Sequence, residues 1–295
     1  NLTSKGRLPC GCDQYLAWTE GMKHELLDFH PDVESDQVVV GGSPQFDFHM
    51  HPDFHLTREE FCREVGLVAE RPIVVYSGVT PGLMPHEPEV VASLVEAVRA
   101  GRIHGDPQLL VRPHPVDDGA RYRGFRERFP EVALFIPGEK AGGDERRLVA
   151  SRDDLRMQIS TVVHGAVHLN VASTMTLDAA ALDRPVVNVR YDPRPSGVGR
   201  SVGMDIYEHT HYRPVLVSGA VRVAHSPDEL VAHVNAYLLD PSLDREGRRQ
   251  IARRICGGLD GRSGQRTAEL IARIANGGRA GAPPDAASSE GARAV

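Results

Sequence analysis

The chain has 295 residues and a formal net charge of −6, and 41% of its residues are hydrophobic. This length holds one large domain or two modest ones and is ample for a buried core. Because basic residues are not in excess, a broad nucleic-acid surface is excluded, and any anion-binding site has to be local.

No run of about eighteen apolar residues is present to cross a membrane. The chain begins without Met, in the polar stretch 1–9, and we expect a sequence truncated at its N-terminal end, with no signal peptide.

The first seventy residues predict a small α/β segment followed by a connector. The predicted elements are, in chain order, a strand (15–18), a helix (20–29), a strand (37–40), a turn (41–44) and a helix within the connector (58–65). These elements resemble the tail of a domain whose beginning lies outside the chain.

From residue 71 onward, apolar strands alternate with helices, which is the main fold signal. Strands are predicted at 72–77, 108–112, 132–136, 167–171, 185–189 and 221–224, and helices at 88–100, 119–129, 153–163, 174–182, 227–239, 244–256 and 262–275. Short, wholly apolar strands joined by helices predict a parallel sheet covered on both faces. We therefore expect a doubly wound, Rossmann-like α/β domain.

These patterns give a domain assignment. Residues 1–47 are assigned to the tail of a truncated N-terminal domain, and 48–70 to an interdomain connector. Residues 71–276 are assigned to a nucleotide-binding α/β domain. The tail 277–295 is rich in Gly, Ala, Ser and Pro, and we expect it to be disordered.

Cysteine and histidine spacings do not predict a metal site. Cys10 and Cys12 lack the gap of a zinc knuckle and have no second pair, so the four cysteines are interpreted as reduced thiols. The histidines that cluster also lack a second matching group: His49, His51 and His55 near Asp47 and Asp53, and His209 and His211.

The loop after the strand 167–171 carries the strongest site signal. Ser173 and Thr174 open the next helix, where free backbone N–H groups and the helix dipole attract anions and the hydroxyls can add two donors. Asp178 follows roughly 6 Å further along the helix. That step matches the distance from a diphosphate to a ribose, whose hydroxyls suit a carboxylate. The combination predicts a nucleotide site.

Two more loops lie at the same predicted edge of the sheet. Arg112 and His114 end the strand 108–112 between fixed prolines, where they can reach a phosphate. After the strand 72–77, Ser77 offers a hydroxyl and Gly78 allows a ligand to approach the backbone closely. His86 precedes the next helix, and we expect it to act on the diphosphate or as a catalytic acid or base.

Other motifs narrow the function. Arg194 and Arg200 lie in an irregular stretch that we interpret as a solvated loop rather than a phosphate site. A P-loop and a G-x-G-x-x-G fingerprint are both absent from the sequence, which argues against ATPases and ordinary dinucleotide dehydrogenases.

Together, these segments resemble GT-B nucleotide-sugar enzymes, in particular bacterial glycosyltransferases related to CDP-glycerol glycerophosphotransferases and UDP-N-acetylglucosamine 2-epimerases. The resemblance covers residues 13–275 and rests on Asn170 to Asp178, Arg184-Pro185-Val186-Val187, Arg112-Pro113-His114-Pro115 (an R-x-H-P element), Trp18-Thr19-Glu20 and the turn Gly41 to Asp47.

The resemblance implies roles for these residues. Ser173 and Thr174 would hold the donor diphosphate, His114 would neighbour it, and Asp178 would contact the ribose, although the family usually carries Glu there. His86 stands in a His–Arg–x–Glu-like loop that lacks its Arg here. In these enzymes the acceptor site comes largely from the N-terminal domain, so this chain alone can bind a nucleotide without being able to turn over.

The resemblance predicts a cytoplasmic enzyme, in solution or at the inner face of the membrane, that transfers a sugar from a nucleotide diphosphate sugar to an acceptor in cell-surface glycan synthesis. No metal or other cofactor is required in this scheme. Two alternatives stay open: transfer of glycerophosphate from CDP-glycerol, and a non-catalytic nucleotide-sugar-binding module.

Overall fold

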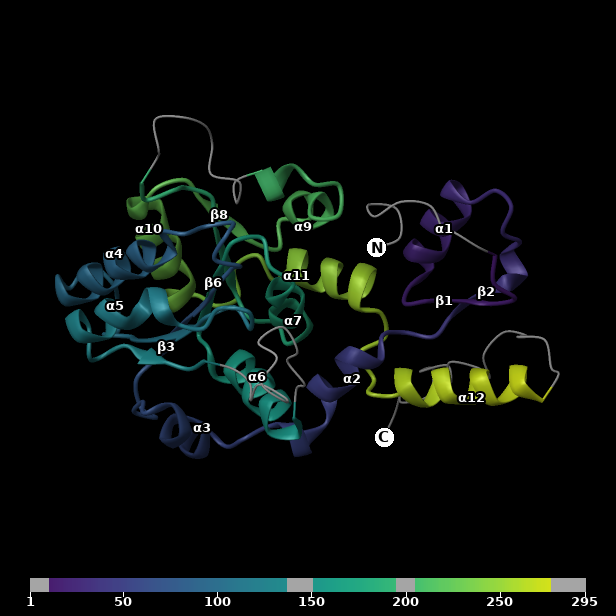
Figure 1. The fold of residues 1–295 in the computed structure, drawn as a ribbon, viewed down its shortest axis with the longest axis horizontal. Coiled ribbons are helices and arrows are strands. Elements are labelled where there is room, and N and C mark those ends of the chain that lie inside the picture. The colour runs from purple at the N-terminus through teal and green to yellow at the C-terminus, as the bar shows by residue number, and fades with distance from the viewer. Residues whose placement is uncertain (1–10, 137–150, 195–204, 277–295) are drawn as a thin grey trace, which may run out of the picture. The chain divides into compact units, whose positions relative to one another are not determined.

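The computed structural model describes residues 11–136, 151–194 and 205–276, which form two compact units (Figure 1). One unit takes residues up to Met50 and from Ala252 onward, and the other runs from His51 to Ile251. None of the helices within the described ranges is long and apolar enough to cross a membrane. The expected tail 277–295 lies outside the described residues.

The larger unit is built on a six-stranded sheet in which every neighbouring pair is parallel. Its strands are β3 (Ile73–Ser77), β4 (Gln108–Arg112), β5 (Ala133–Leu134), β6 (Val167–Asn170), β7 (Val186–Val189) and β8 (Arg222–Ala224). Their order is β5-β4-β3-β6-β7-β8, so the winding reverses between β3 and β6. In open α/β sheets this reversal marks the place where ligands bind, beyond the carboxyl ends of the strands.

Helices cover both faces of this sheet, which is why every residue of β3, β4, β6 and β7 is buried. The helices and turns are η2 (Pro52–Phe54), α3 (Arg58–Val65), α4 (Glu87–Arg99), η3 (Ala120–Tyr122), α5 (Arg123–Arg128), α6 (Arg152–His164), α7 (Met175–Ala181), η5 (Ile206–Glu208), α9 (Arg213–Val217), α10 (Pro227–Leu239) and α11 (Arg245–Ile251). On one face α3 and α6 lie side by side, and Phe61 packs with Val75 and Leu110 (Figure 1).

The smaller unit has a two-stranded parallel sheet of β1 (Tyr15–Ala17) and β2 (Val38–Val40). Its other elements are α1 (Glu20–Phe29), η1 (Ser35–Gln37), α2 (Pro44–Met50), the π-helical turn η6 (Ala252–Cys256) and α12 (Ser263–Ala275). A small core of Ala17, Leu26, Val33 and Val38 holds the sheet against α1.

The division of the chain differs from the expected domain 71–276, because the last two helical segments belong to the smaller unit. Hydrogen bonds between distant residues account for this: Thr19 Oγ1 donates to the Arg254 carbonyl at 2.9 Å, and Arg266 Nε to the Gly41 carbonyl at 2.9 Å. The carboxylate of Asp47 accepts from the backbone N–H groups of Ser263 and Gly264, at 3.0 and 2.6 Å.

Local departures from the predicted elements have local causes. The helix α2 was not predicted; Pro44 is its first residue, a position where a missing N–H costs nothing. The expected helix 119–129 begins as a 3-10 turn after Gly119, whose φ is 76°. The expected strand 132–136 pairs with β4 only through Ala133 and Leu134.

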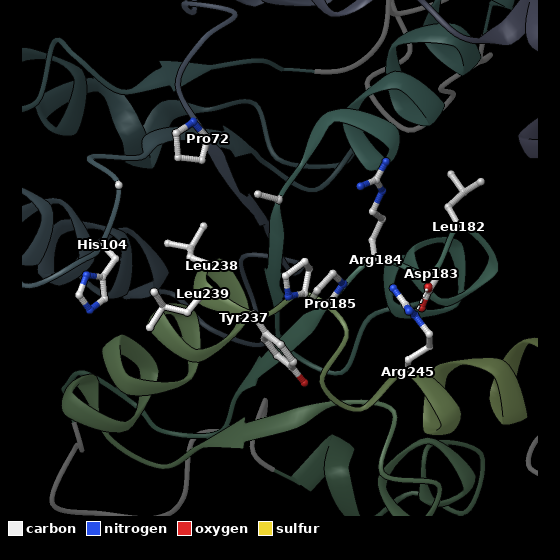
Figure 2. Close-up of a pocket in the computed structure, with 13 residues that line it drawn as sticks. Pro72, His104, Leu182, Asp183, Arg184, Pro185, Tyr237, Leu238, Leu239 and Arg245 are labelled. Atoms are coloured by element: carbon white, nitrogen blue, oxygen red, sulfur yellow. Dashed lines mark hydrogen bonds and ion pairs between the residues drawn. The ribbon is translucent and has the colours of Figure 1, made fainter.

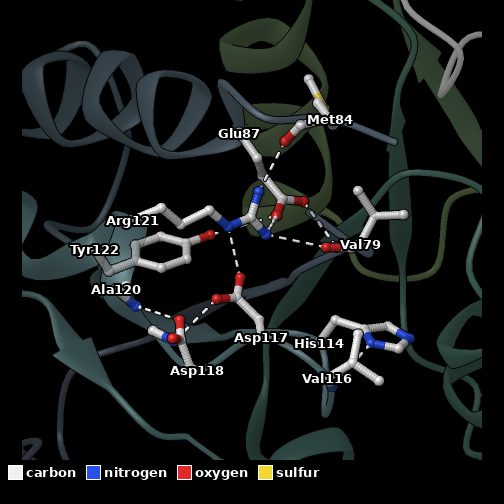
Figure 3. Close-up of polar contacts among 11 residues, drawn as sticks. Val79, Met84, Glu87, His114, Val116, Asp117, Asp118, Ala120, Arg121 and Tyr122 are labelled. Carbon is white, nitrogen blue, oxygen red and sulfur yellow. Dashed lines mark hydrogen bonds and ion pairs between the residues drawn. The ribbon is translucent and has the colours of Figure 1, made fainter. Parts of the chain in front are cut away.

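A buried ion pair fixes the loop that follows β3 (Figure 3). Glu87 has no exposed surface; its Oε1 accepts from Val79 N at 2.9 Å and its Oε2 from Arg121 Nη2 at 2.5 Å. Arg121 also donates to the carbonyls of Val79 and Met84, at 3.0 and 2.8 Å, and to Asp117 Oδ2 at 2.5 Å. The guanidinium of Arg121 and the carboxylates of Glu87 and Asp117 thus hold the loop after β3 against the start of α4.

Burial raises the pKa of Glu87 to about 7, a shift that the charge of Arg121 opposes. Gly78 lies against this pair, since a Cβ there would be 3.1 Å from Glu87 Oε2 and 3.2 Å from His114 N. The ion pair therefore sets how closely the loops after β3 and β4 approach each other.

Removing the Asp47 carboxylate should loosen α12. Asp47→Ala leaves two backbone N–H groups at the start of that helix without acceptors, one buried and one partly buried, a loss of about 1–3 kcal/mol in unfolding free energy. Hydrogen exchange measured on peptides from 263–275 should show faster exchange than in the wild type. Asp28→Ala, which changes an exposed residue of α1, is the control; equal protection in both variants would contradict the proposed contact.

The raised pKa of Glu87 predicts a pH-dependent stability. The pKa of Glu87 is about 7 in the folded protein, against 4.5 in the unfolded chain. The contribution of Glu87 to the unfolding free energy is therefore fully present below about pH 4.5. It is lost as the pH rises to about 7, by on the order of 3 kcal/mol. Glu87→Gln cannot titrate, so the protection factors of β3 amides should fall less between pH 5 and pH 8 in this variant. Glu96→Gln, on the exposed face of α4, should keep the wild-type slope; an unchanged slope in Glu87→Gln would overturn the assignment.

Candidate functional site

Four polar side chains form one row across the carboxyl edge of the larger sheet. The strand register aligns Ser77 with Arg112 on one side and with Asn170 on the other, and Asn170 with Asn188. Register partners in a parallel sheet project to the same face. All four side chains are buried, and buried polar groups need hydrogen-bond partners. We call Arg112, Ser77, Asn170 and Asn188 the polar row.

Asn170 organises the turn that connects β6 to α7. Its Oδ1 accepts three hydrogen bonds, from Ser173 N at 3.1 Å, Thr176 Oγ1 at 3.2 Å and Asn188 Nδ2 at 2.9 Å. The turn contains Ala172 with a φ of 41°, a strained value for a residue with a Cβ. Ala172 N donates to the Tyr207 hydroxyl at 3.2 Å, which supports this conformation.

Three polar atoms in the row have no hydrogen-bond partner among the described residues: Ser77 Oγ, Arg112 Nε and Asn170 Nδ2. They lie on the three adjacent strands β4, β3 and β6, which flank the reversal in strand order. Buried polar groups are normally bonded, so three unmet donors on adjacent strands mark this edge as the candidate ligand site. All three can donate a hydrogen bond, and an acceptor-rich group such as a phosphate matches them.

Arg112 supplies the positive charge of the row. Burial lowers its pKa to about 10, and the carboxylates of Asp178 and Asp154 oppose that shift, so the guanidinium stays charged at neutral pH. Its Nη2 lies 3.5 Å from Gln158 Oε1 on α6. Arg112 is therefore a buried cation whose neighbours leave part of its donor capacity unused.

The predicted residues of the β6–α7 loop divide between the surface and the interior. Thr174 is exposed and Ser173 half-buried, at the start of a helix of only seven residues. Ser173 Oγ accepts from Met175 N at 3.2 Å. Asp178 is only 3% exposed and lies near enough to Arg112 to influence its pKa. The structure thus places Asp178 beside the polar row, and its role at a ribose stays a prediction.

The two predicted histidines occupy different settings. His114 is half-buried next to Gly78, burial lowers its pKa, and its Nδ1 accepts from Val116 N at 3.2 Å (Figure 3). In the neutral ring this bond leaves the proton on Nε2, a donor near the sheet edge. His86 is 44% exposed, and its Nδ1 lies 3.9 Å from Glu89 Oε1. Its catalytic role stays a prediction.

Arg194, a further basic candidate within the described residues, is held in an ion pair. Arg194 pairs with Glu89, with its Nη2 2.7 Å from Oε1, and Arg200 lies outside the described residues. Among the residues that the structure describes, no group of three His, Cys, Asp or Glu side chains could hold a metal ion. Cys12 and Cys62 are free thiols.

Sequence reasoning missed three contributors to this site: Asn188, Tyr207 and Gln158. Asn188 offered one signal, a polar residue inside an apolar strand. The other two reach the site from distant segments, and nothing local in the sequence marks them.

No family model matches the chain, and no curated protein matches it either. Solved structures do. A wall teichoic acid polymerase, TagF, soaked with CDPG is 14% identical with a TM-score of 0.55, over 90% of this chain and 57% of that one. The UDP-GlcNAc 2-epimerase of Neisseria meningitidis, bound to UDP-GlcNAc, is 13% identical with a TM-score of 0.55, over 88% and 61%.

A putative UDP-N-acetylglucosamine 2-epimerase from Listeria monocytogenes is 14% identical with a TM-score of 0.54, over 93% of this chain and 61% of that one. The chain thus spans about three fifths of the length of these proteins. Together with the six parallel strands and their order, these likenesses confirm the predicted Rossmann-like α/β architecture: the chain has the GT-B-like fold of TagF and the UDP-GlcNAc 2-epimerases.

Proposed function

We propose that this chain binds the nucleotide diphosphate part of an activated donor and belongs to a glycosyltransferase that transfers the sugar of that donor to an acceptor. The observation that carries the proposal is the polar row, on the strands that flank the reversal of strand order. Three of its buried donor groups have no partner in the described part of the chain. Ligands bind at this position in open α/β sheets.

The chemistry of the row suits a diphosphate. Arg112 offers a charged guanidinium, while Ser77, Asn170 and His114 offer neutral donors. Ser173 and Thr174 add two hydroxyls in the turn that follows β6. Charge-assisted hydrogen bonds of this kind would stabilise the negative charge that develops on a nucleoside diphosphate as it leaves. Because these donors are fixed by the sheet and by Asn170, they need little reorganisation when the bond breaks.

Gly78 and the Glu87–Arg121 pair would shape the phosphate pocket from the other side. The backbone N–H of Gly78 donates to the Arg112 carbonyl at 2.8 Å, so the loops after β3 and β4 are joined directly. A Cβ at Gly78 would lie only 3.2 Å from His114 N, so glycine allows the two loops to pack this closely.

A second candidate is transfer of glycerophosphate from CDP-glycerol. The TagF and epimerase structures match this chain equally well, each with a TM-score of 0.55. The fold therefore favours neither donor, and the preferred base separates the two functions.

Removing the hydroxyls of Ser173 and Thr174 should weaken nucleotide binding. At about 1 kcal/mol for each hydrogen bond, the Ser173→Ala, Thr174→Ala variant should bind its nucleoside diphosphate roughly ten- to thirtyfold less tightly, as measured by isothermal titration calorimetry. Ser35→Ala, an exposed hydroxyl in the smaller unit, is the control and should bind as the wild type does. Unchanged affinity in the double variant would sink the assignment of these two residues.

A panel of nucleotides should identify the donor class. Each nucleotide is added separately: UDP, dTDP, CDP, GDP or ADP. A nucleotide present at about a hundred times its dissociation constant adds roughly 2.7 kcal/mol to the unfolding free energy. Stabilisation by UDP or dTDP would support sugar transfer, and stabilisation by CDP would support glycerophosphate transfer. If none of the five shifts the melting temperature, this chain by itself is not a nucleotide-binding module.

A further inference from the structure

A cavity lies at the opposite edge of the same sheet, away from the polar row. Its volume is about 630 Å³. It is lined by Pro72, which precedes β3, by Ala166, which precedes β6, and by Pro185, which precedes β7. Because all six strands are parallel, their amino ends gather at this edge. The cavity is therefore separate from the nucleotide site proposed above.

One part of the cavity is apolar. The last turn of α10 contributes Tyr237, Leu238 and Leu239, and the end of α7 is followed by Leu182 (Figure 2). Leu239 is 68% exposed, so its side chain can contact a ligand. With Pro185, these residues form a surface suited to an aromatic or aliphatic group.

The side of the cavity next to Leu182 carries an excess of positive charge (Figure 2). Asp183 is shared between two arginines: Arg245 Nε lies 2.7 Å from its Oδ2, and Arg248 Nε lies 2.9 Å from its Oδ1. Arg248 is 1% exposed and gives further donors to backbone carbonyls, so it stays in place. The single carboxylate of Asp183 thus pairs with two arginines, which leaves a net positive charge.

Arg184 adds a third cation that is incompletely satisfied. Its Nε is buried and has no hydrogen-bond partner among the described residues. Arg58 is held nearby by hydrogen bonds to three backbone carbonyls, and its charge repels that of Arg184. Burial lowers the pKa of Arg184; the charge of Asp183 opposes this shift, and the charge of Arg58 adds to it. A negative ligand group here would relieve both the unmet donor and the repulsion between cations.

We propose that this cavity is a second ligand site, which takes a small organic anion: a carboxylate or phosphate monoester attached to an apolar body. The anionic group would lie at Arg184 and Arg245, and the apolar body on the α10 surface. The volume lies within the range of small-molecule sites, about 300–1,000 Å³. This assignment does not depend on the proposed transferase function.

The test uses anilinonaphthalene sulfonate, a fluorescent probe that combines an aromatic body with an anion. Leu239→Asp puts a negative charge on an already exposed position and should weaken binding of the probe by about tenfold or more; Arg184→Gln, which removes the cation, should do the same. The matched controls are Val217→Asp, at a residue 79% exposed on α9, and Arg128→Gln, on the exposed side of α5. Both should bind the probe as the wild type does.

Competition distinguishes this site from the sheet edge that carries the polar row. Phenyl phosphate should displace the probe at lower concentration than inorganic phosphate, because only the former has an apolar body. UDP and CDP should leave the probe bound. Displacement by these nucleotides, equal losses in the controls, or full affinity in Leu239→Asp and Arg184→Gln would overturn the proposal. If Arg184→Gln lowers the melting temperature, Leu239→Asp alone decides the outcome.

Discussion

The parallel direction of all six strands is the constraint on which the larger unit depends. It forces the carboxyl ends of the strands to one edge and their amino ends to the other, so the two edges acquire different chemistry. The carboxyl edge carries the polar row of Arg112, Ser77, Asn170 and Asn188. The amino edge carries prolines, apolar side chains and an arginine cluster. The polar row also depends on register, because a slip of one residue would turn each polar side chain to the opposite face.

Burying a polar group costs free energy unless the group is hydrogen-bonded. The buried polar groups of this chain divide into those with partners and those without. Asn170 Oδ1 is saturated by three donors, and Glu87 is enclosed by Arg121, Val79 and the Tyr122 hydroxyl. These groups hold loops. By contrast, Ser77 Oγ, Arg112 Nε and Asn170 Nδ2 lack partners among the described residues. The side chain of Asn170 thus belongs to both groups. Its Oδ1 accepts the bonds that shape the turn, and its Nδ2 has no partner among the described residues.

The likeness to solved enzymes concerns the fold. At 12–16% identity, an architecture can persist while the site changes, so the function has to be argued from the residues themselves. This chain matches about three fifths of the length of TagF and of the epimerases. The donor-binding chemistry is proposed from side chains within the chain.

The sequence by itself determined the local elements. Periodicity predicted α1, α3, β4 and α10 at their observed bounds, and the run of apolar strands predicted a parallel sheet. It also identified the polar residues at strand ends, because Arg112, Ser77 and Ser173 follow or end buried strands. These predictions hold because helix spacing, caps and strand burial depend on residues close together in the chain.

Only the tertiary structure decided which elements belong together and which polar groups are used. The assignment of α12 to the smaller unit depends on Asp47, which lies more than two hundred residues earlier. The burial of Asp178 beside Arg112, the enclosure of Glu87 rather than His86, and the sharing of Asp183 by Arg245 and Arg248 depend on contacts between distant segments. Such contacts leave no periodic trace in a single sequence, because burial and partner choice are set by packing in three dimensions.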